Sequence, residues 1–270
     1  MYHRAPMRPR PPRALAVASL LLAAALAGCG DPPAPAPSAA ASAAPSAVPA
    51  PPPATSAAAP APPPRKKDVV CSNKPEVTFE NPTLESVVRV QAQKKAGPIL
   101  RADLARVKTL NLSEAQGLDE LDPCIFPAFT ALKGLYLPMS KIDDLTPIKG
   151  LTQIESLRLA ATAIKDITPL AGLIKLDRLD IGRTPVTDLA PLAGLVNLTE
   201  LQIDETEVTD LAPLSNLKKL TLLQMKRTRV SDLSPLREIR TLKQLYIEGS
   251  MVKDTSPLFG IPGLKIHEGS

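Results

Sequence analysis

The chain has 270 residues, a formal net charge of +5 and no tryptophan, and aromatic residues make up only 3% of it. So few aromatic side chains argue against a surface that stacks sugar rings or single-stranded nucleic acid. Only His267 of the two histidines lies outside the first 28 residues, which argues against a histidine-based catalytic triad and a His/Cys metal site. The glycines form no phosphate-binding motif, so we expect no enzyme, no cofactor and no small-molecule substrate.

Residues 1–28 have the pattern of a signal peptide. Four arginines precede an apolar or small-residue run, Ala14 to Ala27, which is shorter than the roughly 20 residues of a comfortable membrane span. Leu26-Ala27-Gly28-Cys29 follows at once and resembles a bacterial lipobox, whose cysteine is lipidated and becomes the first residue of the mature chain. The alternative is an ordinary signal peptide followed by a chance cysteine.

The resemblance to lipoproteins implies a membrane anchor in the bacterial cell envelope through lipidated Cys29. Several acyl chains would hold the protein there, whereas a single chain binds a membrane only marginally. Asp31 stands one place after the position that would indicate retention in the inner membrane, which favours the outer membrane. Removing the four arginines of residues 1–28 from a net charge of +5 leaves about +1, so the basic precursor is no sign of nucleic-acid binding.

Residues 29–67 follow as a lipidated cysteine and a linker of proline, alanine and serine. This composition has no periodic apolar face, and we expect a disordered tether with polyproline character and a reach of at most about 100 Å. Arg65-Lys66-Lys67 ends the linker. These cations either contact anionic lipid or wall polymer, or mark a solvated boundary.

Residues 68–131 lack a regular repeat and are expected to form an N-terminal cap that includes a first degenerate repeat. Asn81 before Pro82 predicts the start of a helix, and Gly97-Pro98 its end. A second short helix is expected at 101–106, and 107–112 is expected to be the first strand.

Cys71 and Cys124 are the cysteines that remain once Cys29 carries lipid. An exported chain meets an oxidising compartment, so an even pair predicts a disulfide. A redox-active pair is the alternative, and it would need closer spacing or a reactive environment.

The stretch from Leu132 to Leu264 repeats every 22 residues. Each repeat has a proline, with an aspartate three residues before it, and the prolines are Pro147, Pro169, Pro191, Pro213, Pro235 and Pro257. Leu179-Asp180-Ile181 alternates like a half-buried strand, and leucines follow Pro191 at helical spacing. We therefore expect one strand, one turn and one short helical or 3₁₀ return in each repeat, stacked so that neighbours share a core.

The pattern L-x-x-L-x-L-x-x-T-x-V-x-D-L-x-P-L-x-x-L resembles the leucine-rich repeat of internalins over about Val107 to Leu264. The resemblance implies an α/β leucine-rich repeat solenoid with parallel strands on the concave face and a small helical cap. We assign residues 132–270 to six repeats and the C-terminal end. Ser or Thr stands where these repeats often have Asn, and we expect its hydroxyl to bond the backbone of a neighbouring turn.

The column of aspartates allows two interpretations. Carboxylates in register could bind calcium, but calcium-binding solenoid repeats use glycine-rich motifs that are missing from this sequence. Each aspartate stands just before a turn that a proline begins, where a carboxylate caps free N–H groups. We expect caps and no metal site.

Polar residues beside each L-x-L triplet are expected to line the concave face and to contact a partner. These candidates are Tyr136, Arg158, Arg178, Asp180, Arg183, Gln202, Asp204, Glu205, Gln224, Lys226, Arg227, Tyr246 and Glu248. Their charges alternate between repeats, as do those of Glu207 and Arg229, so they could equally keep the repeats in register. Tyr136 and Tyr246 are either binding residues or rim residues that pack on their neighbours.

The sequence supports a protein-binding module at the cell envelope, with an unidentified protein as partner. A structural lipoprotein that serves as a spacer is the alternative. A regulatory subunit of an enzyme such as a phosphatase is a third hypothesis, which export disfavours.

Overall fold

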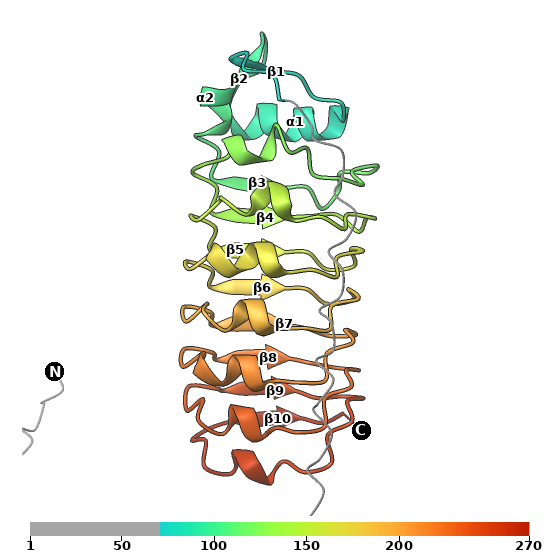
Figure 1. Ribbon diagram of the computed structural model, residues 1–270, viewed down its shortest axis with the longest axis vertical. Coiled ribbons are helices and arrows are strands. Elements are labelled where there is room, and N and C mark those ends of the chain that lie inside the picture. The colour runs from blue at the N-terminus through green and yellow to red at the C-terminus, as the bar shows by residue number, and fades with distance from the viewer. Residues whose placement is uncertain (1–70, 270) are drawn as a thin grey trace, which may run out of the picture. The chain divides into compact units, whose positions relative to one another are not determined.

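The computed structural model describes residues 71–269. Eight strands form one parallel sheet in which each strand pairs with its neighbours in sequence (Figure 1). They are β3 (Thr109–Asn111), β4 (Gly134–Tyr136), β5 (Ser156–Arg158), β6 (Arg178–Asp180), β7 (Glu200–Gln202), β8 (Leu222–Gln224), β9 (Gln244–Tyr246) and β10 (Lys265–His267). The predicted leucine-rich repeat solenoid is confirmed.

The register keeps equivalent residues side by side. Leu157 pairs with Leu179, which pairs with Leu201, and each step from β4 to β9 is one 22-residue repeat. The two end steps differ, because Leu110 pairs with Leu135 at an offset of 25 residues and Leu245 pairs with Ile266 at an offset of 21 residues. Central strand residues such as Leu179 and Leu201 point inward and are buried.

Short 3₁₀ helices form the face opposite the sheet (Figure 1). They are η1 (Phe126–Ala128), η2 (Thr146–Ile148), η3 (Thr168–Gly172), η4 (Ala190–Leu192), η5 (Ala212–Asn216), η6 (Ser234–Leu236) and η7 (Ser256–Leu258). The six that follow a repeat aspartate begin in the same way: the carboxylate Oδ1 accepts the N–H of the residue two places on, at 2.8 Å. The capping role predicted for the aspartates is confirmed.

The threonine column differs from our expectation. Thr162, Thr184, Thr206 and Thr228 are buried, and each hydroxyl donates to the carbonyl three residues before it, at 2.6–2.8 Å. Each of these hydroxyls therefore closes its own turn. Backbone bonds join the turns instead, as from the Arg183 N–H to the Asp204 carbonyl at 2.7 Å. The predicted bond to a neighbouring turn is wrong.

A helical segment covers the first end of the sheet (Figure 1). Helix α1 (Pro82–Gln91) begins where predicted, because the Asn81 side chain accepts the N–H groups of Thr83 and Leu84 at 2.9 Å. The helix ends at Gln91, before Gly97, since Gln93 takes a left-handed φ of 54°. Helix α2 spans Arg101–Leu104.

Two features tie the start of the described chain to this end of the domain. The antiparallel strands β1 (Glu76–Val77) and β2 (Ile99–Leu100) pair, which the sequence analysis did not predict. Cys71 and Cys124 form a disulfide. Between residues 71 and 269 no helix is long and apolar enough to cross a membrane. The segments that the sequence predicts as a signal peptide, a lipidated Cys29 and a linker lie outside the described residues.

Candidate functional site

The outward side chains of the sheet and of the turns that follow its strands make one surface, which we call the strand face. Seven of the thirteen predicted contact residues lie in strands β4 to β9, and they are Tyr136, Arg158, Arg178, Asp180, Gln202, Gln224 and Tyr246. The other six lie in the turns just after strands, and they are Arg183, Asp204, Glu205, Lys226, Arg227 and Glu248. The parallel register therefore gathers them on one face of the domain.

The first depression on this face lies over strands β4 to β7. Its volume is about 290 Å³, and its lining includes Tyr136, Ser156, Arg158, Arg178, Asp180, Glu200 and Gln202. Arg158 and Asp180 are joined by an ion pair of 3.1 Å across neighbouring strands. We call this hollow the N-terminal depression.

Two opposite charges in the N-terminal depression remain apart. Arg178 and Glu200 are register partners on β6 and β7, yet no ion pair joins them in the described structure. Arg178 instead lies 3.5 Å from Asp177 and keeps 59% of its side chain exposed. Glu200 has no ion pair among the described residues, and the exposed Arg178 guanidinium, although paired with Asp177, can still contact a charged partner surface.

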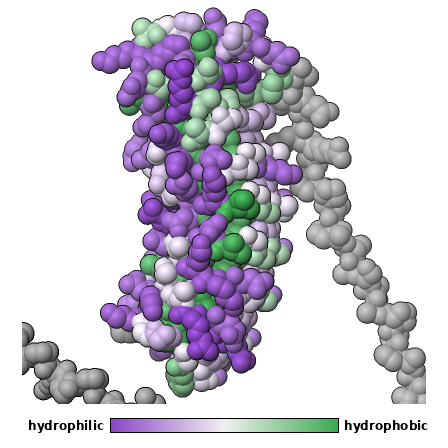
Figure 2. All heavy atoms as spheres, turned by 90° about the vertical axis from the view of Figure 1, so that its left-hand side faces the viewer, coloured by the Kyte–Doolittle hydropathy of each residue, from purple (hydrophilic) through white to green (hydrophobic). Residues whose placement is uncertain are grey.

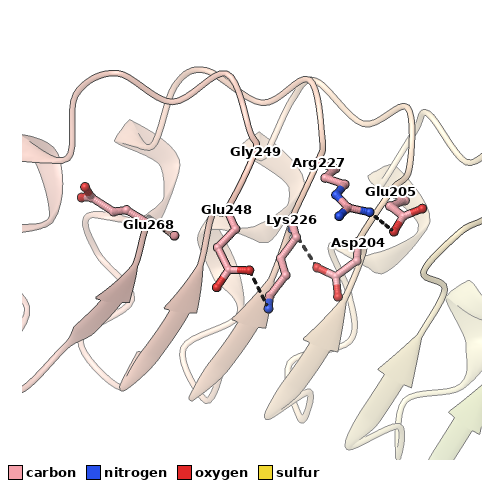
Figure 3. Close-up of a pocket in the computed structure, with 8 residues that line it drawn as sticks. Asp204, Glu205, Lys226, Arg227, Glu248, Gly249 and Glu268 are labelled. Carbon is pink, nitrogen blue, oxygen red and sulfur yellow. Dashed lines mark hydrogen bonds and ion pairs between the residues drawn. The ribbon is translucent and has the colours of Figure 1, made fainter.

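The second depression lies beyond the carboxyl ends of β7 to β10 (Figure 3). It measures about 670 Å³ and is lined by Asp204, Glu205, Lys226, Arg227, Glu248, Gly249, Glu268 and Gly269. Ion pairs join Lys226 to Glu248 at 3.0 Å and Arg227 to Glu205 at 3.1 Å (Figure 3). We call it the C-terminal depression.

Asp204 is a partly buried acid of the C-terminal depression. Burial raises the pKa of its carboxyl group above the ordinary value, and the nearby charges of Asp180 and Glu205 act in the same direction. The backbone N–H of Lys226 donates to this carboxylate at 2.7 Å and partly offsets the rise in pKa. One oxygen of Asp204 therefore holds two adjacent repeats together.

The turn residues of the strand face include a strained column. Arg183, Glu205 and Arg227 have φ values of 53–56°, a conformation that side-chain-bearing residues rarely adopt, and Gly249 follows in the next repeat. The strain persists at positions whose side chains are charged and largely exposed to solvent.

The sequence analysis did not select Glu200 or Glu268 among its contact residues. Glu200 occupies the first outward position of β7, and that position carries a charge in β6 as well. Glu268 lines the C-terminal depression, but its place follows from the shortened step between β9 and β10. Arg183, Gln224 and Tyr246 line neither depression.

Tyr246 is engaged within the domain. Its ring stacks on that of His267 with centroids 4.2 Å apart, and the Lys226 ammonium lies 5.0 Å from its centroid. Tyr136 donates from its hydroxyl to Ser156 at 3.3 Å. Both tyrosines thus pack on their neighbours while keeping an outward edge.

Among residues 71–269, no group of three or more His, Cys, Asp and Glu side chains is placed to hold a metal ion.

Comparison with solved structures identifies the family. Internalin C2 of Listeria monocytogenes is 32% identical, with a TM-score of 0.59, over 71% of this chain and 94% of its own. The chain belongs to the internalin family. The internalin inlF of the same species is 25% identical, with a TM-score of 0.61, over 70% of this chain and 56% of its own.

A third similar structure shows the fold alone. It is a leucine-rich repeat protein of Leptospira interrogans, 17% identical with a TM-score of 0.56, and the match covers 62% of this chain and 45% of that one. Searches with protein-family models and among curated proteins find no match.

On the strand face of this internalin, some charged residues form ion pairs between repeats and others do not. Three ion pairs cross neighbouring repeats: Arg158–Asp180, Lys226–Glu248 and Arg227–Glu205. These support a role in keeping register. No ion pair joins Arg183 to Glu205 or Glu207 to Arg229 in the part of the chain that the structure describes, so the predicted columns pair only in part.

Proposed function

We propose that this internalin is a protein-binding module anchored to the bacterial cell envelope through lipidated Cys29, and that the strand face contacts its partner. Similarity to internalins supports a protein-interaction module in general. The anchor is supported by the sequence Leu26-Ala27-Gly28-Cys29 and the apolar run before it. Those residues precede the described structure.

The N-terminal depression carries the proposal for the strand face. Arg178 and Glu200 lie beside one another with opposite charges, and neither neutralises the other. If register were their only role, an ion pair across the two strands would be expected. A partner that places an acid beside Arg178 and a base beside Glu200 would form an ion pair with each of them.

A structural spacer is the second candidate. The three ion pairs between repeats favour it, because they bind the solenoid to itself and leave fewer charges for a partner. In that case the value of the protein would lie in its anchor and its linker, and the strand face would have no specific ligand.

Photo-crosslinking in cells separates the two candidates. The probe replaces Gln202, which lines the N-terminal depression, and a control probe replaces Gly194, an exposed residue in the turn between η4 and β7, outside the strand face. A binding module gives a discrete protein adduct from Gln202 alone. No adduct, or the same diffuse smear from both positions, would support the spacer.

A charge reversal then tests the two residues that do not pair with each other. We expect Arg178→Glu to lower the yield of the Gln202 adduct at least tenfold, because it sets two acids side by side at the contact. Arg229→Glu makes the same change in net charge at an exposed residue outside the strand triplets and should leave the yield unchanged. Equal loss in both variants would contradict a specific site.

A further inference from the structure

The second surface of interest is the edge at which the strands begin, on the left-hand side of Figure 1. It consists of the turns that lead from each 3₁₀ helix into the next strand, and we call it the entry edge. Hydrogen bonds hold these turns in line: Asn197 Nδ2 donates to the Ile174 carbonyl at 2.9 Å, and Thr241 Oγ1 to the Lys218 carbonyl at 2.9 Å. Equivalent residues of successive turns therefore form straight files.

Cations dominate the entry edge. Six have no carboxylate partner in the described structure, and they are Lys149, Lys175, Lys218, Lys219, Arg240 and Lys243. Where these side chains donate, they donate to neutral groups: Lys175 to Gln153 and Lys219 to Asn197 at 2.7 Å, and Lys243 to the Pro262 carbonyl at 3.1 Å.

The acids on the same edge are already engaged. Glu155 pairs with Lys133 at 2.6 Å, Asp177 lies 3.5 Å from Arg178, and Glu238 lies 3.5 Å from Arg237. The unpaired charge of the entry edge is therefore positive, although the mature chain as a whole is expected to be nearly neutral.

Exposed apolar side chains lie among these cations. Ile174 and Val196 occupy one file and are 59% and 50% exposed, and Phe259 is 81% exposed in the turn after η7. Figure 2 faces this edge and shows a hydrophobic cluster midway along it, with strongly hydrophilic side chains next to it. A purely electrostatic contact would leave these apolar groups without a role.

We propose that the entry edge binds the surface of an anionic lipid bilayer. Lysine and arginine side chains are attracted to acidic headgroups, and aliphatic and phenyl side chains enter the boundary between headgroups and acyl chains. An acidic polymer such as nucleic acid would use the cations but not Ile174, Val196 and Phe259. The edge stands beside the strand face, so a domain resting on a membrane in this way keeps the strand face open.

Vesicle binding tests the proposal without the lipid anchor. Residues 30–270 are mixed with vesicles of phosphatidylglycerol and phosphatidylcholine or with vesicles of phosphatidylcholine alone, and the bound fraction is measured by sedimentation. Binding is expected only to the anionic vesicles, and it should weaken as salt is raised above about 0.1 M. Absence of binding to the anionic vesicles would overturn the proposal.

Matched variants locate the contact. Lys218→Ala with Arg240→Ala should weaken vesicle binding roughly 30-fold, about fivefold for each cation removed. Lys165→Ala with Lys253→Ala makes the same charge change at exposed lysines outside the entry edge and should have little effect. Equal weakening by both pairs would show that only net charge matters and would overturn the proposal.

The apolar contribution needs its own variant. Ile174→Ser with Val196→Ser keeps every charge and should still lower binding to the anionic vesicles several-fold. Undiminished binding would show that the cations act alone and would contradict insertion at the headgroup boundary. Thermal unfolding by circular dichroism verifies that each variant is folded. The Gln202 adduct is scored separately, so loss of one surface is distinguishable from loss of the other.

Discussion

At the scale of single residues, the buried threonines decide how each turn closes. The Thr184 hydroxyl donates to the Ile181 carbonyl at 2.6 Å, and the side chain is 3% exposed. Valine fills the same space but leaves this buried carbonyl without a donor. We expect Thr184→Val to lower the free energy of unfolding by about 1–2 kcal/mol, measured by urea denaturation.

Thr209→Val is the control, because Thr209 is exposed and should change stability by less than about 0.5 kcal/mol. Thr184→Ser should retain most of the stability of the original chain. Equal effects of the two valine variants would show that the bond to Ile181 contributes nothing net.

Ala161 belongs to the strained column of turn residues and has the smallest side chain that feels the strain. Its φ is 58°, and its N–H donates to the Gly182 carbonyl at 2.9 Å, so the conformation is fixed by the next repeat. A β-carbon makes this conformation costly, and glycine adopts it freely. Ala161→Gly should therefore raise the free energy of unfolding by about 1 kcal/mol.

Ala163→Gly supplies the contrast, because Ala163 is exposed and is not among the residues of positive φ in the described chain. There the added freedom of the unfolded chain should lower stability by about 0.5–1 kcal/mol. Parallel denaturant titrations of the two variants should thus move in opposite directions.

At the scale of elements, the aspartate caps of the 3₁₀ helices make the stability of the domain depend on pH. Donation from the Ser256 hydroxyl and then the Ser256 N–H lowers the pKa of Asp254, and Ser234 does the same for Asp232. A folded pKa below the unfolded value of about 3.9 gives stability that is present above that pH and lost as pH falls through the folded pKa. The domain should weaken as pH falls below about 4.

Asparagine variants test this assignment. Asp232→Asn with Asp254→Asn keeps a capping oxygen and removes the titration, so the loss of stability between neutral pH and about pH 3 should be smaller. Asp204→Asn should act in the opposite direction, because burial raises the pKa of Asp204 and protonation favours its folded form. Urea midpoints at both pH values distinguish the two.

The elements also show what the sequence could and could not predict. Leucines such as Leu179 and Leu201 recur in phase, so the sheet and the 3₁₀ returns followed from periodicity alone, and Asn81 before Pro82 placed the start of α1. The β1–β2 pair has two residues in each strand and no pattern of its own. The strand-face residues were predictable as a surface, but which charges pair depends on side-chain packing.

At the scale of the whole molecule, the repeats behave as units that contact only their neighbours. Each strand pairs with the next one along the chain, and the turns bond to those one repeat away. Stability in such a fold is roughly a sum of repeats and their interfaces. Removing one complete repeat should therefore leave a folded, shorter solenoid.

Deleting residues 176–197 takes out one 22-residue period together with β6 and η4. Lys175 then precedes Leu198, which takes the place of Leu176, so the sheet can close in register. We expect a circular dichroism spectrum and a cooperative unfolding transition like those of the full chain. Deleting 176–195 instead leaves Val196 and Asn197 as two extra residues before Leu198, so the turn must bulge and the unfolding midpoint should fall below that of the 176–197 deletion.

The same deletion separates recognition from spacing. It removes Arg178 and Asp180 from the N-terminal depression, so a binding module should lose the Gln202 adduct although the domain is folded. Deleting residues 220–241 also removes one period but spares that depression, and the adduct should persist. A spacer shortened by one repeat should behave alike in both deletions, because its role depends on the anchor and linker and not on which strands remain.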